Sequence, residues 1–250
     1  MTLVLPDKST SVVRDLRRIL GNAKVQNDTP TLTAYAVDAS IYRMTPQAVV
    51  LVETEEDIEA VIRFAVARGI PLTPRAAGTN LTGSAIGAGI VLDVSRMNRI
   101  LEVNEAEGWA RVQPGIVLAE LNKQLSRRTL MFGPDPSSGD MCKLGGMLAN
   151  NSAGPHTLAY GAVKDNVHRL RMCLPSGAWL TAAPLKLDDP ALAQTLSAHP
   201  TLASLLHLVR EHKASIDAKR PTVSKNSCGY NLFGLAEGLD RGIYDLPRLF

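Results

Sequence analysis

The 250-residue sequence has few cysteines, few aromatic residues and little net charge, and each shortage excludes a class of protein. Its three cysteines, Cys142, Cys173 and Cys228, are too few and too scattered for a disulfide framework or a metal site, and they fit a reducing compartment. Aromatic residues make up only 4% and the net charge is +3. These values argue against nucleic acid as a partner, because neither stacking platforms nor a strongly basic surface is indicated.

Long apolar runs and recognisable metal-ligand spacings are also missing. No run of about 18 apolar residues occurs, so no integral membrane segment is predicted. The first thirteen residues lack the apolar core of a signal peptide. The five histidines have no H-x-x-x-H spacing, so no metal site is predicted. We therefore expect a cytoplasmic protein, with peripheral association with a membrane left open.

Two familiar phosphate-binding motifs are absent as well. The sequence has no G-x-x-x-x-G-K-[ST], which excludes a P-loop nucleotide hydrolase. It has no G-x-G-x-x-G between a strand and a helix, which argues against a Rossmann nicotinamide site. Any nucleotide must therefore be bound in another way.

What the sequence does contain is a loop of mostly small residues at 74–84, PRAAGTNLTGS, between two short apolar runs, 70–73 and 90–94, that we expect to be strands. Successive backbone N–H groups in such a loop can form a concave nest for an anion such as phosphate. Arg75 adds a planar fork suited to phosphate oxygens, and Thr79 and Asn80 add polar groups. The alternative is a tight turn that needs glycine only for its own backbone angles.

The residues before this loop predict a βαβ unit. We expect helices over 11–21 and 31–37 and a strand over 48–52. The sequence 54–57, TEED, resembles a capping box that opens a helix ending at Gly69. Strand, helix and strand in this order favour parallel strands.

The pattern changes after residue 95. We expect a hairpin from 100–104 and 109–113, a helix over 118–126, a second hairpin around 175–177 and helical structure over 190–217. The sequence thus predicts an α+β fold. Its two halves are a small βαβ subdomain, 1–95, and a larger subdomain, 96–250, with a mixed or antiparallel sheet and helices.

A second glycine-rich stretch, 133–161, lies in the larger half and includes a short expected helix, 144–149. So long a loop inside a compact domain is usually functional, although an Ω-loop packed on itself is the alternative. Two such loops, one from each half, favour a ligand that lies between the halves.

Taken together in their order, these residues resemble the FAD-binding domain of the p-cresol methylhydroxylase and vanillyl-alcohol oxidase type. The branch most resembled is that of the D-lactate, glycolate and D-2-hydroxyglutarate dehydrogenases. The resemblance covers roughly 35–181, and the later basic loop matches at 225–226 and 229–231. It rests on DASIY (38–42), PLTPR (71–75), AGT (77–79), TG (82–83), VLD (91–93), MN (97–98), QPG (113–115), CKLGG (142–146), NSAG (151–154) and YG (160–161).

The resemblance implies which residues contact FAD. The first loop would hold the FAD phosphates through Arg75, Ala76, Ala77, Gly78, Thr79 and Asn80. The second stretch would run beside adenosine and flavin through Pro134, Ser138, Gly145, Gly146, Asn151, Ser152, Gly154 and Gly161. Thr79 stands where some relatives carry a histidine bonded to flavin, so non-covalent FAD is implied. Ala76 and Ala77 replace the commoner Gly-Gly, where a positive φ would cost about 1 kcal/mol.

The resemblance also implies a function, an FAD-dependent dehydrogenase that oxidises a 2-hydroxy acid such as D-lactate, glycolate or D-2-hydroxyglutarate. Relatives continue beyond the position of Phe250 with a substrate-binding cap, so we expect this sequence to be an N-terminal portion. A C-terminal cap or an iron–sulfur partner would then complete it. No catalytic base is assigned; Lys225 and Asn226 are candidates to face the flavin, and a merely solvated loop is the alternative. For the chain as a whole, the alternative is a flavin-binding fragment without activity of its own.

Overall fold

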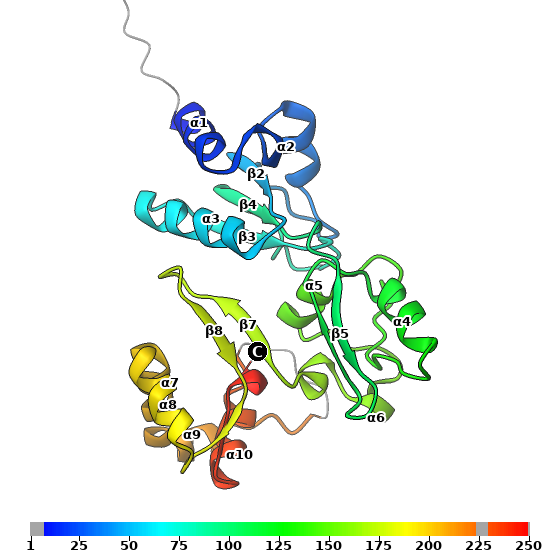
Figure 1. The fold of residues 1–250 in the computed structure, drawn as a ribbon, viewed down its shortest axis with the longest axis vertical. Helices are drawn as coiled ribbons and strands as arrows, with labels where there is room; N and C mark the ends of the chain where they lie inside the picture. Colours follow the sequence, from blue (N-terminus) through cyan, green and yellow to red (C-terminus); the bar gives the residue numbers. More distant parts are fainter. Residues whose placement is uncertain (1–7, 224–229, 250) are drawn as a thin grey trace, which may run out of the picture.

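The computed structural model describes residues 8–223 and 230–249 (Figure 1). Its buried side chains form separate hydrophobic cores. The first part is built on a four-stranded sheet of order β1-β2-β4-β3. Strand β4 lies between β2 and β3 and runs parallel to both, whereas β1 is antiparallel to β2. The strands are β1 (Val25–Gln26), β2 (Ala48–Leu51), β3 (Leu72–Arg75) and β4 (Ile90–Asp93). The predicted βαβ unit is confirmed, and the two-residue β1 was not predicted.

Helices α1 (Lys8–Leu20) and α3 (Glu55–Arg68) pack on this sheet through fully or nearly fully buried Leu16, Val61 and Ala65. Helix α3 begins at the predicted capping box, in which Thr54 Oγ1 accepts from Asp57 N and the Asp57 carboxylate accepts from Thr54 N. It ends at Gly69, which has the left-handed conformation that glycine adopts readily. A shorter helix, α2 (Thr29–Tyr35), is capped by Asp28.

The middle of the chain forms the predicted hairpin and two of the predicted helices. Strands β5 (Ile100–Asn104) and β6 (Trp109–Val112) pair antiparallel, and α4 (Leu118–Ser126) packs beside them. Helix α5 (Leu144–Ala149) contributes Met147 to a neighbouring core. A single further turn, α6 (Thr157–Tyr160), was not predicted.

The last part carries two antiparallel pairs, β7–β8 and β9–β10, and four helices around a fourth core. The 190–217 region is helical as predicted but divides into three helices at His199 and His212, the first break coming directly before Pro200. Helix α10 and strands β9 and β10 were not predicted. The elements are β7 (Leu170–Cys173), β8 (Trp179–Ala182), β9 (Pro184–Lys186), α7 (Pro190–Ala198), α8 (Pro200–Glu211), α9 (Lys213–Ala218), α10 (Leu232–Asp240) and β10 (Ile243–Asp245).

The β7–β8 hairpin reaches back to the first part of the chain at α3 (Figure 1). Arg171 forms a bidentate ion pair with Glu55 at 2.6–2.9 Å and stacks on the Trp179 ring, 4.8 Å from its centre. At the hairpin turn, a Cβ on Gly177 would lie 2.6 Å from Arg63 Nε. The φ of 79° is what favours glycine there, because the exposed Arg63 side chain could move aside.

The α+β class is confirmed by these elements. The first core draws on residues from Val12 to Met97, and the remaining cores lie later in the chain. The division into 1–95 and 96–250 stays a prediction. Over 8–223 and 230–249, no helix has the length and apolarity needed to cross a membrane.

Candidate functional site

The loop after β3 presents a run of unpaired backbone donors. From Ala76 to Leu81 no backbone N–H donates a hydrogen bond to any residue that the structure describes. Residues 76–80 are half-buried, and Leu81 is exposed. Half-buried backbone donors normally have partners, and a series of them is the arrangement that binds phosphate in backbone nests.

This loop is held in place by the segment before β2. Ala39 N donates to Gly78 O at 3.0 Å, and Asn80 Nδ2 donates to Asp38 Oδ2 at 2.9 Å. Asn80 Oδ1 accepts from the backbone of Thr82 and Ser84 at 3.1 and 2.9 Å. Both ends of the Asn80 amide are therefore used within the protein, and the side chain shapes the loop. Its role as an FAD ligand stays a prediction.

Arg75 makes similar internal contacts. Its Nη1 donates to Val37 O at 2.8 Å, and its guanidinium lies over the Tyr35 ring, 5.0 Å from the centre. Gly78, with φ of 72°, passes so close that a Cβ there would be 2.7 Å from Arg75 Nη2. The guanidinium thus packs against the backbone of the loop at Gly78. Its contact with phosphate stays a prediction.

A buried carboxylate closes this network. Asp93, 3% exposed at the end of β4, accepts from Tyr35 Oη at 2.5 Å and from Ser95 N at 2.6 Å. Burial, and next the hydrogen bond to Asp93, raise the pKa of Tyr35, so the phenol keeps its proton at neutral pH. The Tyr35 ring that supports Arg75 is therefore tied to the sheet.

The second glycine-rich stretch meets the first loop at α5. A Cβ on Gly146 would lie 3.5 Å from Ala76 Cβ, so the two stretches are neighbours in space. Gly145 N donates to Pro114 O at 2.8 Å, and a Cβ on Gly145 would be 2.8 Å from Pro114 Cβ. A Cβ on Gly115 would in turn be only 2.2 Å from Val94 O. The ends of β3 and β4 and the start of α5 therefore converge.

The remaining predicted residues lie where the second stretch packs on itself. Pro134 is buried, and the following residue, Asp135, approaches Gly154 so closely that a Cβ on Gly154 would be 2.0 Å from Asp135 O. Ser152 N donates to Met147 O at 2.8 Å, which joins this part to α5. The other members are Ser138, whose carbonyl accepts from Met141 N and Cys142 N, Asn151, whose Oδ1 accepts from Lys164 N, and Gly161, with φ of 74°.

Of the predicted set, the structure brings the loop 75–80 and Gly145–Gly146 together directly. It joins 151–154 to them through α5, and among the described residues no hydrogen bond links Pro134, Ser138 or Gly161 to the first loop. Two shallow hollows elsewhere, on α1 and beside α4, include none of these residues. Lys225 and Asn226 lie outside the described residues.

Comparison with known proteins agrees with this geometry. A family model described as "FAD binding domain" matches residues 46–183, more than half of the chain, and the match includes both glycine-rich stretches. The chain belongs to this FAD-binding domain family. FAD is accordingly its cofactor, and the resemblance on which the sequence prediction relied is confirmed.

Relatives of this FAD-binding chain bear the names of 2-hydroxy-acid enzymes. A "D-2-hydroxyglutarate dehydrogenase" of Pantoea ananatis is 33% identical over 97% of the chain and 25% of that protein. The "Glycolate oxidase subunit GlcD" of Escherichia coli K12 is 33% identical over 74% of the chain and 38% of that protein. The chain thus spans a quarter to two-fifths of these relatives. The structure of p-cresol methylhydroxylase is 18% identical and superimposes with a TM-score of 0.60. The match covers 72% of this chain and 36% of the p-cresol methylhydroxylase chain, and it confirms the fold alone.

Sequence reasoning missed the residues that support the loop. Asp38, Asp93 and Gly115 all lie within segments that carried the resemblance, yet none was given a role. The signal was available for Asp93, because a carboxylate directly after an apolar run at the end of a strand needs partners once it is buried. The fit to FAD rests on the loop itself, because its N–H groups have no partner within 8–223 and 230–249 and its small side chains leave the backbone accessible to a diphosphate.

Proposed function

We propose that this chain is the FAD-binding part of an oxidoreductase that oxidises a 2-hydroxy acid such as D-lactate, glycolate or D-2-hydroxyglutarate. The observation that carries the proposal is the run of backbone N–H groups at 76–81 that have no partner among the described residues, beside α5, in a chain of the FAD-binding family. When bound, FAD supplies the acceptor for a hydride equivalent from the substrate. The names of the relatives supply the substrate class.

In this proposal the backbone of 76–80 binds the diphosphate and the side chains beneath it keep the loop in shape. Arg75 and Asn80 hold the loop through the contacts described above, and the Arg75 charge favours an anion nearby. Gly145, Gly146 and 151–154 line the seam along which adenosine and flavin would lie. Thr79 has no nucleophilic nitrogen to bond to flavin, so the cofactor is proposed to be non-covalent.

No residue is assigned as the catalytic base. None of the residues proposed to contact FAD has a side chain that would accept the hydroxyl proton of the substrate at neutral pH. This favours a second candidate, a flavin-binding chain that needs a separate substrate domain, such as a C-terminal cap or an iron–sulfur partner. A cytoplasmic location stays a prediction under both candidates.

The visible spectrum of the purified chain, mixed with FAD and freed of excess cofactor, distinguishes the two. Flavin absorbance that disappears when D-lactate, glycolate or D-2-hydroxyglutarate is added anaerobically supports the enzyme, and L-lactate serves as the control substrate. Flavin absorbance that none of these acids changes supports the second candidate. A protein that retains no flavin contradicts both as descriptions of this chain.

A further inference from the structure

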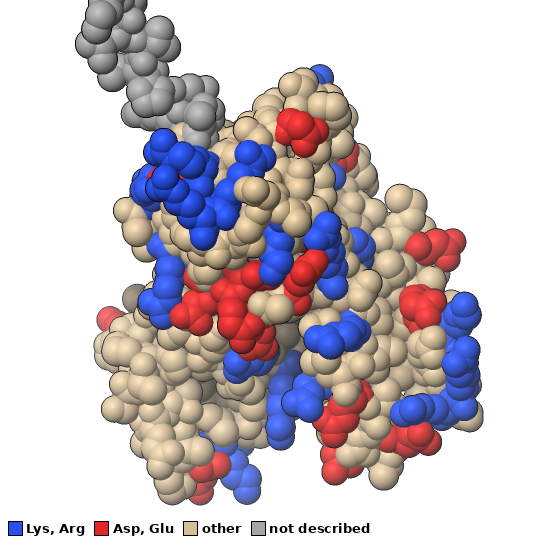
Figure 2. All heavy atoms as spheres, turned by 45° about the horizontal axis from the view of Figure 1, so that its top comes forward, with Lys and Arg blue, Asp and Glu red and all other residues tan. Residues whose placement is uncertain are grey.

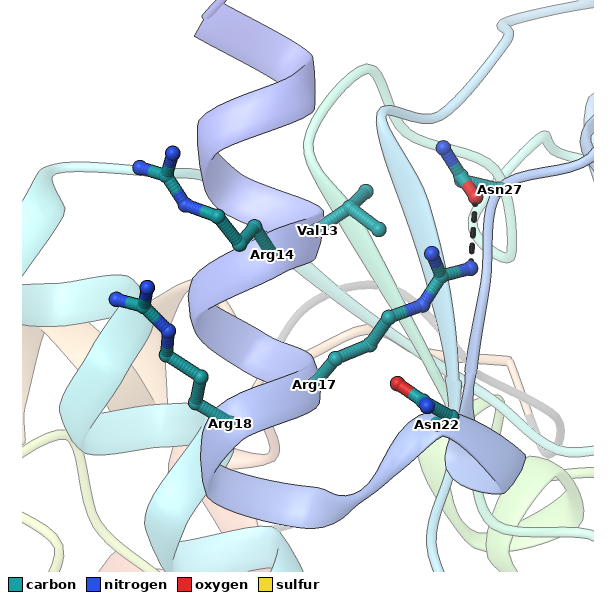
Figure 3. A pocket seen from close by; sticks show the side chains of 6 residues that line it. All are labelled: Val13, Arg14, Arg17, Arg18, Asn22 and Asn27. Atoms are coloured by element: carbon teal, nitrogen blue, oxygen red, sulfur yellow. Dashed lines mark hydrogen bonds between the residues drawn. The ribbon is translucent and has the colours of Figure 1, made fainter.

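A second candidate ligand site lies on α1, away from the flavin loop. A hollow of about 470 Å³ opens beside this helix, and Figure 2 shows basic side chains gathered there. Its lining comes from α1 and the segment that follows it (Figure 3): Val13, Arg14, Arg17, Arg18, Asn22 and Asn27. Three arginines around one hollow are not used by the proposed flavin chemistry.

The helix that carries these arginines is firmly placed. Val12, Val13 and Leu16 are only 5%, 3% and 0% exposed, so one face of α1 is part of the first core. Arg14 and Arg18 are one turn apart on the opposite face, with side chains 61% and 72% exposed. Their guanidinium groups therefore start from fixed backbone positions and reach into solvent.

The one acidic neighbour of Arg14 and Arg18 among the described residues is already paired. Asp15 accepts from Arg68 Nη2 at 2.7 Å, whereas Arg14 and Arg18 approach it only to 3.5 and 3.6 Å. The hydrogen bond from Arg68 is the main reason that the pKa of Asp15 is lowered. Four arginines against one carboxylate leave a local excess of positive charge.

Arg17 and two asparagines complete the lining. Arg17 donates to Val25 O and, through Nη2, to Asn27 Oδ1 at 2.9 Å, which holds its guanidinium at the edge of the hollow (Figure 3). The side-chain Nδ2 of Asn27 and both polar atoms of the Asn22 side-chain amide make no hydrogen bond to a described residue. Figure 3 shows Arg17 and the two asparagines on one side of α1 and the Arg14 and Arg18 side chains extending to the other, so the hollow is bordered by guanidinium and amide groups from both sides of the helix.

We propose that this hollow binds a phosphate-bearing anion. Guanidinium groups pair with phosphate oxygens through parallel hydrogen bonds, and several of them suit a group with more than two acceptor oxygens. Arg17 and Arg18 lie in the last turn of α1, where the helix dipole itself disfavours an anion. The attraction therefore comes from the side chains, which makes it removable by substitution.

A second arginine pair provides a matched control. Arg127 and Arg128 line a hollow of similar size, about 490 Å³, after α4. That hollow also contains Glu120, and Arg128 lies 3.5 Å from Glu105. Because carboxylates offset the charge there, we expect little affinity for phosphate at Arg127 and Arg128.

The test is a titration with inorganic pyrophosphate followed by amide chemical shifts of the isotopically labelled chain, first saturated with FAD. The proposal predicts shifts at Val13, Arg17 and Asn27. It also predicts that the pyrophosphate dissociation constant measured from them rises at least about tenfold in Arg14→Gln/Arg18→Gln. Arg127→Gln/Arg128→Gln should bind like the parent chain. The map of shifts separates this site from residues 76–80, so it can be read even if the chain fails to bind FAD.

A parallel arm identifies the source of the phosphate. Sedimentation with vesicles of phosphatidylglycerol and phosphatidylcholine, compared with phosphatidylcholine alone, detects a lipid headgroup as the ligand. Pyrophosphate shifts without sedimentation indicate a soluble ligand, and sedimentation abolished by Arg14→Gln/Arg18→Gln indicates a lipid. The proposal is overturned if the chain shows neither pyrophosphate shifts nor vesicle sedimentation. It is also overturned if Arg14→Gln/Arg18→Gln and Arg127→Gln/Arg128→Gln lose binding equally.

Discussion

Gly146 faces Ala76 across the seam between the two glycine-rich stretches, and a Cβ added on Gly146 would lie 3.5 Å from Ala76 Cβ. That distance is an ordinary van der Waals contact, so an alanine fits at 146 without displacing the neighbour. The adjacent Gly145 differs, because a Cβ there would be 2.8 Å from Pro114 Cβ. Two neighbouring glycines in α5 therefore have different reasons to be glycine.

Alanine substitutions should separate these two reasons. Gly146→Ala should raise the free energy of unfolding by about 0.5–1 kcal/mol, as expected for glycine replaced inside a helix. Gly145→Ala should lower it by about 1–3 kcal/mol through overpacking. If FAD lies along the seam, Gly146→Ala should nevertheless weaken FAD binding. Urea unfolding and flavin fluorescence titration measure the two quantities, and equal stability changes in both variants would contradict the packing argument.

The loop at 74–84 gives one member of a second matched pair. Gly78 and Gly108 have φ of 72° and 69°, but a Cβ on Gly108 meets nothing within 4 Å, whereas one on Gly78 meets the Arg75 guanidinium. Alanine should cost about 1–2 kcal/mol of stability at either position through its backbone angle. Only Gly78→Ala should also displace Arg75 and reduce FAD affinity, by about tenfold or more. An unchanged FAD dissociation constant in Gly78→Ala would argue against this loop as the cofactor site.

Local signals made much of this arrangement predictable. The Thr54–Asp57 box and Gly69 marked both ends of α3, and the spacing of apolar residues placed α4 at its observed bounds. The absence of positive φ at Ala76 and Ala77 also removes the strain considered for the Ala-Ala pair. These features depend on neighbours in sequence, which is why a single sequence carries them.

The elements and roles that were missed depend on distant partners. Strand β1 has only two residues and exists through its pairing with β2, and β9 depends on β10, far along the chain. The internal use of Arg75 and Asn80 comes from the backbone of Val37 and the carboxylate of Asp38, about 40 residues earlier. The guanidinium of Arg75 can donate to phosphate oxygens or to main-chain carbonyl oxygens, and only the fold shows which of these acceptors it meets.

The Lys24–Asp57 pair should give the first core a dependence on acid. Burial pushes the pKa of Asp57 upward, but the Lys24 ammonium at 2.7 Å and the backbone N–H of Glu53 outweigh it, so the pKa is lowered. A carboxylate with a lowered folded-state pKa stabilises the protein above its unfolded pKa of about 3.9, and the contribution is lost as the pH falls through the folded value. Asp57→Asn should flatten this part of the profile of unfolding free energy against pH. A parallel profile for parent and variant would contradict the assignment.

Removal of the Tyr35 hydroxyl tests the support beneath the loop. Tyr35→Phe keeps the ring under Arg75 but leaves the buried Asp93 without its phenol donor, which should cost about 1–3 kcal/mol of stability. Tyr42→Phe is the control, since the Tyr42 side chain is 56% exposed and should change stability by less than about 0.5 kcal/mol. Thermal unfolding of both variants measures the difference. A Tyr35→Phe variant as stable as the control would mean that Asp93 does not depend on this bond.

The most direct test of the proposed cofactor site is a crystal structure of the chain with FAD bound. We expect diphosphate oxygens within hydrogen-bond distance, about 2.7–3.2 Å, of backbone nitrogens between Ala76 and Asn80, with the flavin extending past Gly146. A diphosphate placed elsewhere, with these nitrogens still unpaired, would contradict the proposal.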